Sequence, residues 1–249
     1  MKVSVITVCY NSETTVREAI NSVLSQDYTD LEYIVVDGCS KDSTLNIINE
    51  YSTRVTRIVS EPDKGLWDAM NKGIELSTGD CFCFLNSDDF FADPGVVTRM
   101  VRRLTQTNAD AVYGYVDIVD PIATDKVIRR YRISYCNKTI FRLGMMPAHP
   151  GFMCKRSFFE RYGGFLLDDA MPQDFELLVR YLAKGNMKAK LLPEVIVRMR
   201  NGGVSNRSFM DRVKRVKALV DACRMNGVWT SIFIVPLKYP VKIYEYVRK

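Results

Sequence analysis

The feature that most constrains the fold of this chain is a repeated alternation of short apolar runs with amphipathic stretches. Runs rich in β-branched and apolar residues occupy 3–9, 31–37 and 55–60, and a fourth begins at Cys81. The stretches between them place apolar residues at helical spacing. Strands that alternate with helices through short turns are typical of a parallel sheet. The sequence therefore predicts an α/β fold with a mostly parallel, doubly wound sheet and helices on both faces.

Polar residues follow each predicted strand at the point where it ends. The first strand is followed by Tyr10 and Asn11, the second ends on Asp37, the third is followed by 61–63, and the fourth by 86–89. Ligands of doubly wound sheets bind outside the carboxyl ends of the strands. We therefore expect these side chains to share one rim, which is the candidate binding site.

The second half of the chain is less regular. It predicts a helix at 95–106, a strand at 110–118, a basic variable stretch at 124–143, a turn, short strand and helix within 146–165, and a helix at 174–184. Residues 189–199 are predicted to form an edge strand that is broken at Pro193.

The charge of the chain is concentrated near its C-terminus. Residues 206–249 hold ten Lys or Arg against three Asp or Glu, which gives them a net charge of +7. Residues 1–205 carry −1, so the whole chain carries +6. We expect a catalytic domain at 1–205 and a basic, amphipathic, helical extension at 206–249. The extension has two interpretations: a segment that lies on an anionic membrane surface, or a helix packed on the domain with a solvated basic face. We expect no nucleic-acid partner.

The cysteine pattern indicates a reducing compartment. The seven cysteines include no CxxC pair, and the chain has one histidine, so neither a zinc site nor a disulfide framework is expected. The sequence contains no apolar stretch of roughly 18 residues, so no membrane-spanning helix is expected. We expect a cytoplasmic protein. Under the membrane interpretation of the extension, it would bind peripherally to the inner face of the cell membrane.

Asp88 and Asp89 are the first candidates for chemistry. Two adjacent carboxylates at a strand end repel each other unless a cation or a donor joins them. Mg²⁺ and Mn²⁺ accept a few carboxylates and complete their shells with water and phosphate oxygens. The alternative is a solvated acidic turn or a helix N-cap.

Other polar residues have a functional and a structural interpretation. Asp37 can accept hydrogen bonds from a nucleobase or a ribose, or can cap its own turn. Asp174 can act as a general base, or as the N-cap of its helix. His149, between two prolines, lines a pocket or holds a rigid turn. One helical face carries polar residues that contact a ligand or form ordinary ion pairs: Lys64, Asp68, Asn71 and Lys72.

Six segments, in their order and spacing, resemble the family 2 glycosyltransferases, whose nucleotide-sugar-binding fold is called GT-A. The chain resembles the bacterial polysaccharide, O-antigen and colanic-acid type of these enzymes. The resemblance covers residues 2–205. The segments are SVITVCYNSETTVREAINSVLSQDY, EYIVVDGCSKDST, SEPDKGLWDAMNKGIELSTGD, FLNSDD, HPGFMCKRSFFERYGGF and GGVS.

The resemblance implies a donor site in residues 1–118. Asp37 and Asp63 match acids that lie near the nucleobase. The motif that binds ribose and the metal on the diphosphate corresponds to 86–89, where asparagine replaces the first acid. Asp88 or Asp89 is then the ligand of Mn²⁺ or Mg²⁺. The expected donor-binding residues are Tyr10, Asn11, Asp37, Asp63, Lys64, Asp68, Asn71, Lys72, Asn86, Ser87 and Asp88.

The resemblance also implies the reaction and an acceptor site in residues 119–205. Asp174 corresponds to the catalytic base, Gln173 replaces the acid that usually precedes it, and His149 and Gln173 are expected in the acceptor pocket. The implied activity is inverting transfer from a nucleotide-sugar, by family frequency a UDP-sugar, to a glycan or lipid-linked oligosaccharide in cell-surface polysaccharide synthesis. The alternatives are a non-catalytic sugar-nucleotide-binding protein and a nucleotidyltransferase, which would usually open with a Gly-rich basic loop that is absent here.

Overall fold

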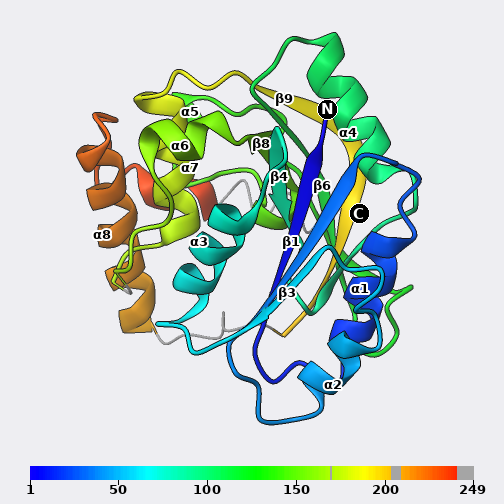
Figure 1. The fold of residues 1–249 in the computed structure, drawn as a ribbon. Helices are drawn as coiled ribbons and strands as arrows, with labels where there is room; N and C mark the ends of the chain where they lie inside the picture. The colour runs from blue at the N-terminus through cyan, green and yellow to red at the C-terminus, as the bar shows by residue number, and fades with distance from the viewer. Residues whose placement is uncertain (169, 203–208, 240–249) are drawn as a thin grey trace.

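The computed structural model describes residues 1–168, 170–202 and 209–239, with the backbone alone described for 209–212. This part of the chain forms one nine-stranded sheet with helices on both faces (Figure 1). The strand order is β3-β2-β1-β4-β8-β6-β9-β5, and β7 pairs with β6 outside this path. The predicted α/β fold class is confirmed.

The first half of the chain follows the predicted alternation closely. Its elements are β1 (Val3–Cys9), α1 (Val16–Leu24), β2 (Leu31–Asp37), α2 (Thr44–Asn49), β3 (Arg57–Ser60), α3 (Leu66–Leu76) and β4 (Cys81–Phe84). The four strands pair in parallel, with β1 between β2 and β4. Their carboxyl ends therefore meet at one edge, as the sequence predicts.

The second half joins this parallel unit through antiparallel strands. Its elements are β5 (Asp89–Phe91), α4 (Val96–Gln106), β6 (Ala111–Val119), β7 (Val127–Tyr131), α5 (Lys138–Arg142), the 3₁₀ turn η1 (His149–Gly151), β8 (Phe152–Lys155), α6 (Ser157–Tyr162), α7 (Gln173–Ala183) and β9 (Ala189–Arg200). Strand β8 lies antiparallel between β4 and β6, whereas β9 is parallel to β6 and antiparallel to β5.

The prediction of an edge strand at 189–199 is wrong. Strand β9 lies inside the sheet, between β6 and β5, and runs without a break to Arg200. Leu191 pairs with Tyr113 of β6, and Val195 pairs with Tyr115. Strand β9 therefore has more residues than β6 in this interval, and the extra residues form a bulge around Pro193. A bulge releases the backbone from the ladder, and a proline, which has no N–H to donate, is tolerated there.

Each face of the sheet carries its own apolar core. Successive strand residues point to opposite faces, so Ile6 and Val8 join a core with α3, α5, α7 and the helix at 209–225, while Val3 and Val5 join a core with α1, α2 and α4. Figure 1 shows these two groups of helices on either side of the sheet. The predicted coverage of both faces is confirmed.

The extension begins with α8 (Phe209–Met225), which packs against α5 and α7. Leu219, Val220, Ala222 and Cys223 are buried in that contact, as expected for the packed-helix interpretation. The predicted boundary at residue 205 and the segment 240–249 lie outside the described residues. A short 3₁₀ turn, η2 (Val235–Leu237), follows α8. In the ranges that the structure describes, no helix combines the length and the apolarity needed to cross a bilayer.

Candidate active site

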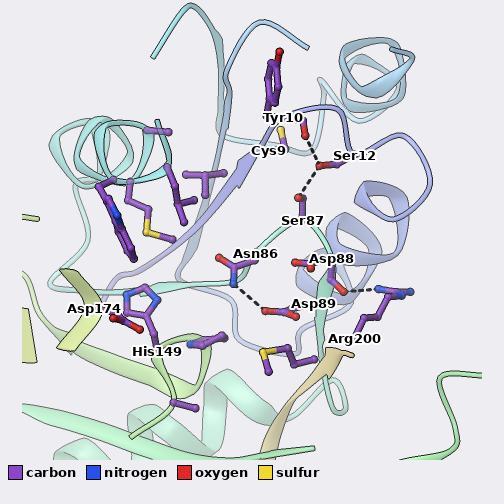
Figure 2. Close-up of a pocket in the computed structure, with 18 of the residues that line it drawn as sticks. Cys9, Tyr10, Ser12, Asn86, Ser87, Asp88, Asp89, His149, Asp174 and Arg200 are labelled. Atoms are coloured by element: carbon purple, nitrogen blue, oxygen red, sulfur yellow. Dashed lines mark hydrogen bonds between the residues drawn. The ribbon is translucent and has the colours of Figure 1, made fainter. Parts of the chain in front are cut away.

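A cavity of about 1220 Å³ opens at the carboxyl ends of β1 and β4 (Figure 2). Its wall comes from the turn after β1, the start of α3, the β4–β5 connection, η1, the start of α7 and the end of β9. The predicted site residues that line it are Tyr10, Asp63, Asn86, Ser87, Asp88, Asp89, His149 and Asp174. Segments distant in sequence therefore deliver polar groups to one space.

The two adjacent acids occupy different environments. Asp88 is partly exposed, whereas Asp89 is the first residue of β5 and is fully buried. Asn86 Nδ2 donates to Asp89 Oδ2 at 3.0 Å. Burial raises the pKa of Asp89 well above its usual range, and the negative charge of Asp88 raises it further. A cation at this point would offset both effects and favour the ionised carboxylate.

The oxygen donors around Asp89 fit a divalent metal. Asn86 Oδ1 and Asp89 Oδ1 are buried and have no hydrogen-bond partner, which is costly unless a ligand or ion satisfies them. Together with the Asp88 carboxylate they are the hard donors that Mg²⁺ and Mn²⁺ accept. Within the described ranges, no group of three or more His, Cys, Asp or Glu side chains could hold a metal. The remaining positions would therefore come from water and a bound diphosphate.

The balance of charge in the cavity also favours a bound cation. The lining includes four carboxylates against two guanidinium groups, and these residues are Asp63, Asp88, Asp89, Asp174, Arg129 and Arg200. A diphosphate entering such a cavity needs additional positive charge close to its oxygens.

Arg200, which the sequence analysis missed, closes one side of the site. It ends β9, and its Nη1 donates to the backbone carbonyl oxygen of Asp88 at 2.5 Å. Its other terminal nitrogen bonds the carboxylate of Glu18, and its guanidinium lies 5.3 Å from the ring centre of Phe90. The basic end of 189–200 is visible in the sequence. Its place beside Asp88 depends on the pairing of β9 with β5, which the sequence does not reveal.

His149 lies in an aromatic setting on the other side of the cavity. Its ring stacks on Phe84 with centres 5.1 Å apart and meets Phe165 edge-on at 5.6 Å. Burial lowers the pKa of His149, while the negative charge of Asp174 acts in the opposite direction. Figure 2 shows the two side chains next to each other. Since the pKa of His149 is lowered overall, the ring is neutral at neutral pH and can serve as a hydrogen-bonding wall of the site.

Asp174 is the second residue of α7, which begins at Gln173 after Pro172 as N-cap. The N-cap alternative for Asp174 is therefore wrong. A carboxylate in the first helical turn is stabilised by the helix dipole. Asp174 Oδ1 accepts a hydrogen bond from the Phe175 backbone N–H at 2.8 Å. This contact fixes the orientation of the carboxylate at the cavity wall.

Gln173 lies behind the cavity wall instead of lining the pocket. Its side chain is fully buried; it accepts from the Leu166 N–H at 3.1 Å and donates to the Asp168 carbonyl at 2.6 Å. An amide can make both contacts, because it carries a donor and an acceptor. Gln173 therefore fastens the 166–168 segment to the start of α7.

Asp37 is likewise turned inward. It is fully buried and accepts from the Ser40 N–H at 3.1 Å and from Ser60 Oγ at 2.6 Å. Asn11, with a φ of 49°, links the neighbouring turn by accepting from the Lys41 N–H at 2.8 Å. Both residues build the turns around the cavity, as the capping interpretation of Asp37 expects, and neither lines it.

The polar face of α3 forms contacts within the protein. Asp68 accepts from the Lys64 N–H at 2.9 Å, and Lys72 pairs with Glu61 at 2.9 Å. Asn71 bonds both the N–H and the carbonyl of Phe165, each at 2.8 Å. These four contacts position the loop after β3 and the aromatic side of the cavity. Lys64, Asp68, Asn71 and Lys72 do not themselves line the cavity.

Comparison with known proteins gives the class first: the architecture matches structures with the GT-A transferase fold. The crystal structure of Staphylococcus aureus TarS 1–349 in complex with UDP aligns with a TM-score of 0.70 at 18% identity over 89% of this chain, and the chain spans 65% of that fragment. A mannosyltransferase from Pyrobaculum calidifontis, in complex with GDP-Man and Mn²⁺, aligns with a TM-score of 0.67 at 21% identity over 98% of this chain and 69% of its own.

The family follows from the sequence comparisons. The model described as Glycosyl transferase family 2 matches residues 4–163, so the chain belongs to this family. An uncharacterized glycosyltransferase of Mycobacterium tuberculosis is 30% identical over 72% of this chain and 68% of its own length. A PGL/p-HBAD biosynthesis glycosyltransferase of Mycobacterium bovis is 25% identical over 82% and 78%. The predicted resemblance to family 2 is confirmed.

Proposed function

We propose that this protein is an inverting glycosyltransferase that moves one sugar from a nucleotide-sugar, by default a UDP-sugar, to a lipid-linked glycan in cell-surface polysaccharide synthesis. One observation carries the proposal: Asp174, from α7, and Asp88 and Asp89, from the β4–β5 connection, line the same cavity (Figure 2). A proton acceptor and a diphosphate-binding group in one space are what a glycosyl displacement requires.

The donor base is assigned to the end of the cavity formed by Tyr10, Gly38 and Asp63. All three line the cavity, and Tyr10 is 57% exposed, which leaves its ring available for stacking on a base. Asp63 Oδ1 accepts from the Gly65 N–H at 2.8 Å. Because Asp37 is buried and accepts hydrogen bonds from Ser40 and Ser60, we assign the contact with the base N–H to Asp63.

The diphosphate is assigned to the segment 86–89 and the Arg200 side of the cavity. Asp88 and Asp89 would hold Mn²⁺ or Mg²⁺, supported by Asn86 Oδ1. When bound there, the ion would supply positive charge to the leaving diphosphate as a Lewis acid. Arg200 fixes the Asp88 backbone, and its guanidinium adds a further positive charge to this wall.

The chemical step is a single displacement. Asp174 accepts the proton of an acceptor hydroxyl, the hydroxyl oxygen bonds to the anomeric carbon, and the bond from that carbon to the diphosphate oxygen breaks with its electron pair on the leaving nucleotide. Attack from the face opposite the diphosphate inverts the anomeric centre. The His149 ring lines the cavity near Asp174 and packs against Phe84 and Phe165, so these contacts fix one wall of the space in which the acceptor hydroxyl reacts.

The acceptor is assigned to the apolar part of the cavity wall. This part includes Ile118, Tyr131, Met146, Pro147 and Met199. Such a wall suits an acceptor that carries apolar groups near its reacting hydroxyl. This supports a lipid-linked acceptor, and hence a cytoplasmic enzyme that works on the inner face of the cell membrane with 206–249 as its contact.

The test is a donor screen that follows release of nucleoside diphosphate from UDP-, GDP- and dTDP-sugars with Mn²⁺, Mg²⁺ or EDTA. Wild type is compared with Asp174→Asn and with the control Asp168→Asn, an exposed acid in the preceding loop. We expect metal-dependent release from one donor, lost in Asp174→Asn and kept in Asp168→Asn. Equal release by both variants removes Asp174 as the base. Tight donor binding without turnover favours the non-catalytic sugar-nucleotide-binding alternative.

A further inference from the structure

The segment that follows α8 is held to the domain by one set of its side chains. Val228, Thr230, Val235 and Lys238 are buried. Thr230 Oγ1 donates to the Arg142 carbonyl oxygen at 2.6 Å, and Lys238 Nζ donates to the Gly144 carbonyl oxygen at 3.4 Å. Residues 228–238 are therefore anchored at the end of α5.

Other side chains of the same segment are apolar and exposed to solvent. Five large side chains project from it: Trp229, Ile232, Phe233, Leu237 and Tyr239, with exposed fractions of 67%, 53%, 80%, 57% and 41%. We call these five residues the aromatic face. Anchoring a segment so that its apolar side chains point outward has a cost in water, and clustered exposure of this kind marks an interaction surface.

Cationic side chains lie on the two helices next to the aromatic face, α5 and α8. The guanidinium of Arg142 lies 4.9 Å from the ring centre of Trp229. Lys214, Arg215, Lys217 and Arg224 are exposed on α8, against Asp221 as the one acid in 213–239. Aromatic and aliphatic side chains flanked by cations are the combination that binds the interface of an anionic membrane.

We propose that the aromatic face inserts into the headgroup region of an anionic bilayer, with the exposed cations of α8 beside it. This proposal depends on the proposed function only in that both name the membrane as the partner. The apolar side of α8 is buried, so the inserting element is 229–239 and not α8. A second copy of the chain is a poorer occupant, because a two-fold contact through this face would bring the same positive charges together.

The experiment is co-sedimentation of the full chain, without donor or acceptor, on phosphatidylcholine vesicles with and without phosphatidylglycerol. The double variant Ile232→Ser/Phe233→Ser removes apolar contacts and keeps every charge. The control is Ile122→Ser, which changes a side chain that is 92% exposed in the turn between β6 and β7. We expect the double variant to bind anionic vesicles about tenfold more weakly or worse, and the control to bind as wild type does.

A second readout places the face in the bilayer. The chain has two tryptophans, Trp67 at the cavity and Trp229 on the aromatic face. Brominated lipids should quench wild-type fluorescence and should leave Trp229→Phe, which retains Trp67, unquenched. Melting temperatures are compared to show that the variants fold.

Three results would overturn the proposal. The first is equal vesicle binding by wild type and the double variant. The second is salt-sensitive binding without quenching of Trp229, which would assign contact to charge alone. The third is a dimer in light scattering that the double variant abolishes, which would make the partner a second copy. Because no sugar transfer is measured, these outcomes are independent of the proposed catalytic activity.

Discussion

Replacing Gly38 by alanine tests the assignment of the nucleobase end of the cavity. Gly38 directly follows β2 and does not have a positive φ, so alanine fits its backbone. A Cβ at this position would come within 3.0 Å of Asp63 Oδ2, and would lie 3.5 Å from Cδ2 of Tyr10. Contacts under 3.0 Å are essentially never seen for real Cβ atoms, so the added methyl must push the Asp63 carboxylate aside by several tenths of an ångström.

The size of the effect follows from the hydrogen bond that would be displaced. A hydrogen bond to a charged group contributes about 1.5–3 kcal/mol, and loss of most of it corresponds to an increase of about 10- to 100-fold in donor KM. Because the base lies far from the reacting atoms, kcat should change little. Steady-state kinetics with saturating acceptor measure both constants, and donor titration gives the affinity directly.

A double-mutant cycle isolates the mechanism. In an Asp63→Ala background the methyl at position 38 has no carboxylate to displace, so Gly38→Ala should add almost nothing to the loss already present. Additive losses in the cycle, or a Gly38→Ala enzyme with wild-type donor affinity, would refute the assignment of Asp63 to the base.

Three further predictions concern single side chains. Burial alone would raise the pKa of Glu32, but hydrogen bonds from Ser4, Thr78 and Lys2 lower it from 4.5 to about 2. The ionised form therefore stabilises the fold above pH 4.5, and this stability is lost as the pH falls towards 2. Glu32→Gln should lower the free energy of unfolding by about 2 kcal/mol at pH 7, less than the full pKa shift because solvent screens the Lys2 side; a deficit in denaturant titrations that does not shrink at low pH would contradict this. Arg200→Ala should lower kcat/KM about 10- to 100-fold by releasing the Asp88 backbone, and unchanged kinetics would exclude that role. Asp89→Asn should raise the melting temperature without metal, because it removes a buried carboxylate, and should abolish stabilisation by Mn²⁺; a Mn²⁺-induced shift equal to that of wild type would rule out Asp89 as a ligand.

The parallel half of the fold was predictable because three of its strands, β1, β2 and β4, are buried runs followed by polar turns. Buried parallel strands have no alternation to obscure them, and the helices between them carry a clear apolar stripe. The position of β9 was not predictable. Its interior place results from pairing with β6 and β5, and Pro193 suggests an edge unless the bulge beside it is known.

The site shows the same division between local and non-local information. Asp63, Asp88, Asp89 and Asp174 were predicted from strand ends and a helix start, and the structure brings them to one cavity. The burial of Asp37 could not be predicted, because Ser60, which encloses it, comes from a neighbouring strand. Gln173 and Arg200 were misjudged or missed for the same reason: their partners lie in segments whose arrangement the sequence does not specify.

The most direct test of the central claim is the anomeric configuration of the product, read by NMR from a reaction with the donor that the screen selects. With an α-linked nucleotide-sugar, the single displacement assigned to Asp174 predicts a β-linked product from the first turnover onwards. An α-linked product would contradict the account, because retention requires a second displacement or a different mechanism.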